Sequence, residues 1–253
     1  MVARMNEEEA DVGQDSQIGG PVVTGGVTED AFEVLEDALY QLWSTANELA
    51  RIRPPKPKYF RVTIFGSSRI RPGDDIYDEV RHLAADLSSM GCDIVTGGGP
   101  GLMQAANEGA KLGDPDNRTR SFGLPIELPS REEEPNPFVE KLYHHRTFFT
   151  RLHHFVRLSS AFIVVRGGIG TMLETALIWQ LCQVQHVNDI PLIFIGDMWK
   201  ELVEWGKHHM LGSTPELAGA ADLDIPHCVP GVAEACALVA ARKAIFDEKG
   251  VEV

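Results

Sequence analysis

Residues 161–174 have the sequence AFIVVRGGIGTMLE, and this segment gives the clearest indication of the fold class. Ala161 to Val165 are all apolar, which is typical of a strand buried on both faces of a sheet. Gly167-Gly168-Ile169-Gly170-Thr171 then turns the chain into a helix that is predicted to continue to about Val184. A strand, a glycine-rich turn and a helix, in this order, form the repeating unit of parallel α/β sheets.

The same unit occurs twice on the N-terminal side. The two copies are the strand Arg61–Phe65 with the turn Gly66-Ser67-Ser68 and the helix Ile76–Met90, and the strand Asp93–Thr96 with the turn Gly97–Gly101 and a helix from about Leu102 to Lys111. Further predicted elements are the strands Ser121–Glu127 and Pro191–Ile195, the loop Arg131–Pro137, and the helices Thr147–Leu158, Met198–His209 and Pro230–Glu248. The sequence therefore predicts a doubly wound α/β domain, with a parallel, Rossmann-like sheet and helices on both faces.

The chain has 253 residues, which suits one large domain or a domain with tails. Residues 1–27 are acidic and glycine-rich and predict a mobile tail. Residues 28–58 predict a helix, Glu29–Arg51, followed by a proline-rich linker, and residues 59–253 predict the Rossmann-like domain. The apolar side chains of this helix recur every three or four positions. Such a stripe packs either on its own domain or on a second copy of the chain.

Composition excludes several classes of protein. Hydrophobic residues make up 43% and charged residues 24%, as in ordinary globular proteins. The net charge of −14 disfavours nucleic-acid binding but allows a small anionic ligand in a local pocket. The four scattered cysteines indicate free thiols in a reducing compartment. No apolar run is long enough to span a membrane, and the acidic N-terminus does not resemble a signal peptide, so we expect a cytoplasmic protein.

The three glycine or serine turns, 66–68, 97–101 and 167–171, mark the candidate ligand site. In an open α/β sheet the ligand crevice lies at the carboxyl ends of the strands. Glycine lets backbone N–H groups approach a phosphate there, although it also serves tight turns with no ligand. Three such turns favour a nucleotide or phosphate ligand. The dinucleotide GxGxxG, P-loop and GxSxG motifs are absent, which argues against NAD, against a P-loop ATPase and against a serine hydrolase.

Two charged residues accompany these turns. Glu174 lies four residues after Gly170, in the predicted first turn of the helix, and could either act on the ligand or complement the helix dipole. Arg151 has aromatic neighbours that predict partial burial, so it needs an anion, either a ligand phosphate or a carboxylate. The histidines stand in adjacent pairs, which do not readily chelate, and no metal site is expected. No cysteine follows a predicted strand at its carboxyl end, so a cysteine nucleophile is unsupported.

Two segments resemble the LOG (Lonely Guy) family. Residues 97–107, GGGPGLMQAAN, resemble its GGGxGLM element, and residues 166–174, RGGIGTMLE, resemble its PGGxGTxxE signature. The Phe-Phe-x-Arg helix between them also fits, and the resemblance covers about Tyr59 to Leu211. The family cleaves nucleoside 5′-monophosphates, typically AMP or cytokinin nucleotides, into a free base and ribose 5-phosphate.

The resemblance implies that Arg151 and Glu174 are the catalytic pair and that the glycine turns and Met103 contact the substrate. It also implies a homodimer or larger homo-oligomer. The family's older label, lysine decarboxylase, disagrees with this sequence, because nothing in it indicates a lysine for pyridoxal phosphate; no cofactor is expected. The implied site residues are Arg151, Glu174, Gly66, Ser67, Ser68, Gly97, Gly98, Gly99, Met103, Gly167, Gly168, Ile169, Gly170 and Thr171.

The chain departs from the family at three positions. Arg166 replaces the proline of the signature, Leu152 replaces the lysine after the arginine, and Leu173 replaces the acid before the glutamate. The pair itself is kept, so we expect hydrolysis of a purine nucleoside 5′-monophosphate. The departures keep open the alternative of a nucleotide or cofactor carrier without hydrolysis. A second alternative is a phosphosugar or nucleotide transferase that uses the same phosphate-binding turns and an acceptor other than water.

Overall fold

The computed structural model describes residues 33–38, 40, 41, 58–127 and 134–250, without the side chains of 249 and 250. The chain divides into two compact units, residues 1–55 and 56–253. In the first unit, residues 33–38, 40 and 41 are helical and fall within the predicted helix. The remainder of that helix, the predicted tail and the linker up to residue 57 lie outside the described residues.

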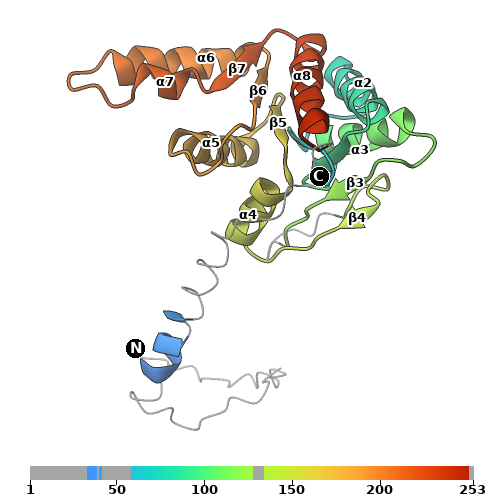
Figure 1. Ribbon diagram of the computed structural model, residues 1–253, viewed down its shortest axis with the longest axis horizontal. Helices are drawn as coiled ribbons and strands as arrows, with labels where there is room; N and C mark the ends of the chain where they lie inside the picture. The colour runs from blue at the N-terminus through green and yellow to red at the C-terminus, as the bar shows by residue number, and fades with distance from the viewer. Residues whose placement is uncertain (1–32, 39, 42–57, 128–133, 251–253) are drawn as a thin grey trace, which may run out of the picture. The chain divides into compact units, whose positions relative to one another are not determined.

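A parallel sheet of seven strands forms the centre of the second unit (Figure 1). Its order is β4-β3-β2-β1-β5-β6-β7, and every neighbouring pair is parallel. The strands are β1 (Arg61–Phe65), β2 (Asp93–Thr96), β3 (Ser121–Gly123), β4 (Lys141–Leu142), β5 (Ala161–Val164), β6 (Leu192–Ile195) and β7 (Pro226–Val229). The order reverses at β1, where Thr63 aligns with Val95 of β2 on one side and Phe162 of β5 on the other. Ligands bind at such reversals.

Helices cover both faces of the sheet, which confirms the predicted doubly wound fold (Figure 1). One face carries α2 (Asp75–Ser89), α3 (Leu102–Gly113) and α8 (Val232–Gly250), and the other carries α4 (Phe148–Leu158), α5 (Ile169–Gln183) and α6 (Asp197–Gly206). Alternate residues of β5 serve the two faces, because Ile163 packs in the first core and Phe162 and Val164 in the second. This two-sided burial explains why β5 and β6 are apolar at every position.

The structure differs from the sequence-based elements mainly at the edges of the sheet. The predicted strand Ser121–Glu127 ends at Gly123, and beyond Pro125 only an isolated bridge joins Ile126 to His145. The edge strands β4 and β7 and the short helix α7 (Ala220–Leu223) are not foreseen, because they are brief and lack a buried apolar run. The helix predicted to end at His209 changes at Lys207 into the π-helix η1 (Lys207–Leu211).

Two further observations concern the cysteines and the apolar character of the helices. All four cysteines are free. Within the described ranges, no helix combines the length and the apolar character that crossing a membrane requires.

Candidate active site

The three glycine turns meet at one edge of the sheet. They follow β2, β1 and β5, which are adjacent and parallel, so all three lie at the carboxyl edge. Backbone hydrogen bonds join them directly: Ser67 N–H donates to Arg166 O at 2.9 Å, and Leu102 N–H donates to Ser67 O at 2.9 Å. The fold therefore brings together segments that are 30 to 100 residues apart in the chain.

Several of these glycines are required by close packing. A Cβ on Gly66 would lie 2.7 Å from Val165 Cγ2. Gly101 has a φ of +73° and faces the backbone of Ser67 and Ser68, so no side chain fits there. At Gly167, an added Cβ would collide with Thr171.

Gly168 and Gly170, unlike the glycines above, have open space where a side chain would lie. A Cβ on either residue would meet nothing within 4 Å, and neither residue has a positive φ. The fold itself therefore does not require glycine at these two positions. Gly168 is the N-cap of α5 and supplies no side-chain hydrogen bond to the first free N–H groups, and Gly170 lies in the first turn of this helix.

Arg151 and Glu174 form a buried ion pair beside these turns. Arg151 Nη1 donates to Glu174 Oε1 at 2.8 Å, and each side chain is 11% exposed. Arg151 Nε also donates to Leu124 O at 2.6 Å, while its guanidinium carbon lies 5.2 Å from the centre of the Phe155 ring. The predicted partial burial of Arg151 is thus confirmed, and its anion in this structure is a carboxylate.

The environment of Glu174 perturbs its protonation. Burial raises the pKa of the Glu174 carboxyl above its ordinary value, and the positive charge and hydrogen bond of Arg151 oppose this rise. One expectation needs correction: α5 begins at Ile169, so Glu174 lies in the second turn and not in the first. Its distance from the helix end, together with its pairing to Arg151, argues against a role that merely complements the helix dipole.

The turn 97–101 packs against the same ion pair at Gly97. A Cβ on this residue would collide with Arg151 Nη2 and would lie 2.7 Å from Met103 Sδ. Gly97, Gly98 and Gly99 are buried, and Met103 is half-buried at the start of α3. The turn 97–101 and the Arg151–Glu174 pair therefore belong to one assembly.

The residues of the turn 167–171 differ in how exposed they are. Ile169 is 87% exposed, whereas Thr171 is buried and its carbonyl accepts a hydrogen bond from Thr175 Oγ1. Ser67 Oγ accepts from Arg69 N–H at 3.1 Å, and Ser68 is half-buried. Apart from Arg151, which lies on α4, the residues predicted for the site lie on the three turns or on α3 and α5, which begin there.

Sequence reasoning missed a network of buried amides and hydroxyls beneath the first turn. Thr96 Oγ1 donates to Asn107 Oδ1 at 2.7 Å and accepts from Gly98 N–H at 2.9 Å. The Nδ2 group of Asn107 donates to Ser121 Oγ, and that of Asn136 donates to Asn107 Oδ1 at 3.0 Å. Asn107 stood within the first family motif, but Asn136 carried no signal beyond its place between two prolines.

Other polar groups near the site have structural partners. His145 Nε2 and His154 Nδ1 lie 3.1 Å apart, which links two of the sequence's histidine pairs. Burial lowers the pKa of His154 to about 4, so this ring is neutral at neutral pH. Arg146, which is 89% exposed along its side chain, pairs with Glu127 at 3.4 Å.

Two of the residues that depart from the family pattern differ in their exposure to solvent. Leu152 is buried, whereas Leu173 is 45% exposed. A buried Leu152 packs with its own domain and needs no charged partner.

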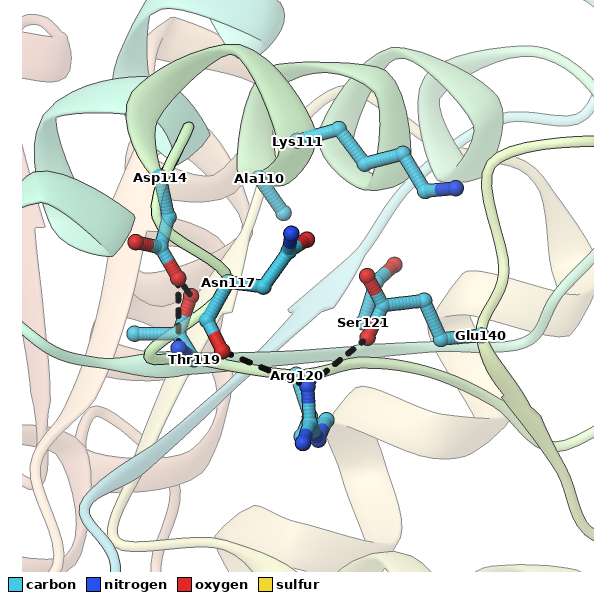
Figure 2. Close-up of a pocket in the computed structure, with 8 residues that line it drawn as sticks. All are labelled: Ala110, Lys111, Asp114, Asn117, Thr119, Arg120, Ser121 and Glu140. Carbon is cyan, nitrogen blue, oxygen red and sulfur yellow. Dashed lines mark hydrogen bonds and ion pairs between the residues drawn. The ribbon is translucent and has the colours of Figure 1, made fainter.

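Two cavities lie away from the ion pair. Figure 2 shows a polar cavity between the end of α3 and the first residue of β3, near Asp114, Asn117 and Arg120. Its volume is about 10 Å³. It has room for about one water molecule and lies at the amino edge of the sheet. A larger, mostly apolar cavity of about 370 Å³ lies between α5, α6 and α7 and includes Trp179 and Trp205. Neither cavity is lined by Arg151 or Glu174.

Comparison with solved structures places this fold among known ones. A molybdenum cofactor carrier protein from Chlamydomonas reinhardtii is 18% identical, with a TM-score of 0.56, over 74% of this chain and 99% of that one. A molybdenum cofactor binding protein from Rippkaea orientalis is 19% identical, with a TM-score of 0.52, over 77% of this chain and 99% of that one. At such identities the likeness concerns the fold.

Sequence comparison adds a family and a relative. The pyrimidine/purine nucleotide 5′-monophosphate nucleosidase of Escherichia coli strain K12 is 30% identical over 140 residues, which are 53% of this chain. The same holds for its counterpart in E. coli O157:H7. The chain spans 30% of the length of these relatives. The family model described as "Possible lysine decarboxylase" matches residues 103–237, which include Arg151 and Glu174. Because this match covers more than half of the chain, the protein belongs to the LOG family.

Proposed function

We propose that the protein hydrolyses the N-glycosidic bond of a purine nucleoside 5′-monophosphate, such as AMP or a cytokinin nucleotide, to the free base and ribose 5-phosphate. The single observation that carries this proposal is the buried Arg151–Glu174 pair beside three glycine turns at the carboxyl edge of the sheet. The nucleosidase with which this chain shares 30% identity supports the reaction class.

The phosphate would rest on the turn 167–171. Its N–H groups at the start of α5 have no capping side chain, and a helix N-terminus favours an anion. The open space over Gly168 and Gly170 supports this placement, because a phosphate needs room close to the backbone. Gly66, Ser67 and Ser68 border the same edge from β1.

Glu174 would act on the sugar. In glycoside cleavage, the bond to the anomeric carbon breaks through a state with oxocarbenium character, and a carboxylate stabilises the positive charge. Water then adds its oxygen to C1′, the electron pair of the C1′–N bond stays on the base, and a water proton ends on that base. Arg151 would hold the Glu174 carboxylate in position through their 2.8 Å hydrogen bond.

The decisive experiment compares wild type with Glu174→Gln on AMP, with free adenine and ribose 5-phosphate measured. We expect a loss of turnover on the order of a thousandfold, with AMP binding retained. Equal turnover in the two proteins would refute the role of Glu174. AMP binding by wild type without any base release would favour the carrier alternative, and a requirement for an acceptor other than water would favour a transferase.

We also propose that the active form is a cytoplasmic homodimer or a larger homo-oligomer. The large apolar side chains of Phe148, Phe149 and Ile169, at the starts of α4 and α5, are 45%, 81% and 87% exposed. A second copy that covers them would remove apolar surface from water. Light scattering of the full chain tests this proposal, and a monomer at all concentrations would refute it.

A further inference from the structure

Asn136 holds the Gly97–Gly101 turn from a distant segment of the chain. Its backbone N–H donates to Gly98 O at 2.8 Å. Its Nδ2 group lies 3.0 Å from Gly98 O and 2.9 Å from Gly99 O, and the side chain belongs to a residue that is 6% exposed. Two consecutive carbonyl groups of the turn are therefore directed towards Asn136.

This arrangement determines where the N–H of Gly99 points. It belongs to the same planar, trans peptide as the Gly98 carbonyl, so it is directed away from Asn136. Gly99 is buried, yet its N–H donates to no group in the part of the chain that the structure describes. Buried backbone N–H groups are nearly always paired, because an unpaired one has lost its water without replacement.

The turn cannot rotate freely to satisfy this donor. Thr96, Asn107 and Asn136 form a closed network in which each side chain has partners, and the network also binds Gly98 N–H. All three residues are nine-tenths or more buried. Reversing the Gly98–Gly99 peptide would break both hydrogen bonds from Asn136 to Gly98 O and turn this buried carbonyl away from its two donors, at a greater cost than one unpaired N–H.

The turn that carries this donor also packs against the ion pair. Gly97, two residues before Gly99, leaves no room for a Cβ beside the Arg151 guanidinium that pairs with Glu174. We propose that Gly99 N–H donates a hydrogen bond to an oxygen of the substrate's ribose phosphate, and that Asn136 is the positioning residue that directs this donor. The inference rests on the proposed function, since it assigns a contact within that substrate site.

A direct test follows the Gly99 amide by NMR in Glu174→Gln protein labelled with ¹⁵N-glycine. Its peak is identified by its loss in Gly99→Ala. AMP and ribose 5-phosphate should shift this peak to saturation, and adenine, which lacks the ribose phosphate oxygens, should not. If other glycine peaks move with AMP while Gly99 stays, the inference is wrong. If no glycine peak moves with any of the three, nucleotide binding itself is refuted.

A second test uses Asn136→Asp, a nearly isosteric change. An ionised carboxylate cannot donate to the carbonyls of Gly98 and Gly99, so we expect kcat/KM to fall about tenfold or more at pH 8. When the carboxyl is protonated its O–H can donate again, so the ratio of variant to wild-type kcat/KM should rise as the pH falls. Circular dichroism measures the folded fraction of the variant at each pH. A purely structural role predicts that kcat/KM per folded molecule equals that of wild type at every pH, and that result would overturn the positioning role.

The matched control is Asn188→Asp. Asn188 is exposed, and its side chain makes no hydrogen bond with the described residues. Its ratio to wild type should stay near one at every pH. If Asn136→Asp does not fold, Asn136→Ser, which keeps one donor, together with the NMR titration of the folded Glu174→Gln protein, still decides the question.

Discussion

The two glycine motifs of this molecule are built in opposite ways. The turn 97–101 is packed tightly: side chains would collide at Gly97 and Gly101, and a buried network that includes Asn136 binds its carbonyls. The turn 167–171 is open over Gly168 and Gly170, and the helix behind it has no side-chain cap. Glycine therefore serves close packing in the first turn, whereas at Gly168 and Gly170 it leaves open space, which agrees with the proposed phosphate site.

The largest effect expected from this contrast concerns Gly97→Ala. Its methyl group would collide with Arg151 and Met103, so either the turn or the arginine must move. Because misplacing a catalytic group by about 1 Å costs on the order of a hundredfold in rate, kcat for AMP should fall by about that factor. Steady-state kinetics checks the loss, and circular dichroism confirms folding. Wild-type turnover in Gly97→Ala would show that the tight packing of the first turn does not position Arg151.

The Arg151–Glu174 ion pair leads to a prediction on how kcat/KM depends on pH. A carboxylate that must be ionised loses activity as the pH falls through its pKa, and burial raises the pKa of Glu174. The acid limb of kcat/KM should therefore lie above the usual glutamate value of about 4.3. Arg151→Met removes the charge that opposes this rise, so its acid limb should move to still higher pH. If the acid limb of kcat/KM in Arg151→Met lies at the same pH as in wild type, Arg151 does not influence the pKa of Glu174.

The smallest effect is expected for Gly170→Ala, and its sign differs between stability and binding. The added methyl group meets no atom of the protein, and alanine favours a helix over glycine, so the free energy of unfolding should rise by roughly 0.5–1 kcal/mol. The methyl group would occupy space assigned to the phosphate, so AMP should bind about tenfold more weakly. Thermal unfolding and calorimetric titration measure the two quantities. Tighter or equal AMP binding would show that the open turn is not the phosphate site.

Much of the central sheet could be predicted from the sequence. The strand at residues 161–164 is apolar at every position, the strand at residues 61–65 is apolar at three of five, and a glycine follows each of them within three residues, which marks where the strands end. The edge strands β4 and β7 could not be predicted, because an edge strand of two to four partly exposed residues has no distinctive pattern. Their pairing depends on neighbours that are distant in the chain.

The fold class and the two candidate residues, Arg151 and Glu174, could be read from the sequence alone, because buried strands, glycine turns and the family motifs are local patterns. Only the tertiary structure decided that Glu174 accepts a hydrogen bond from Arg151, 23 positions earlier, and that Asn136 binds carbonyls 37 and 38 positions before it. These contacts join elements whose separation in space follows from the packing of the whole sheet. No local pattern records which buried polar group will meet which, because the requirement is only that each finds a partner.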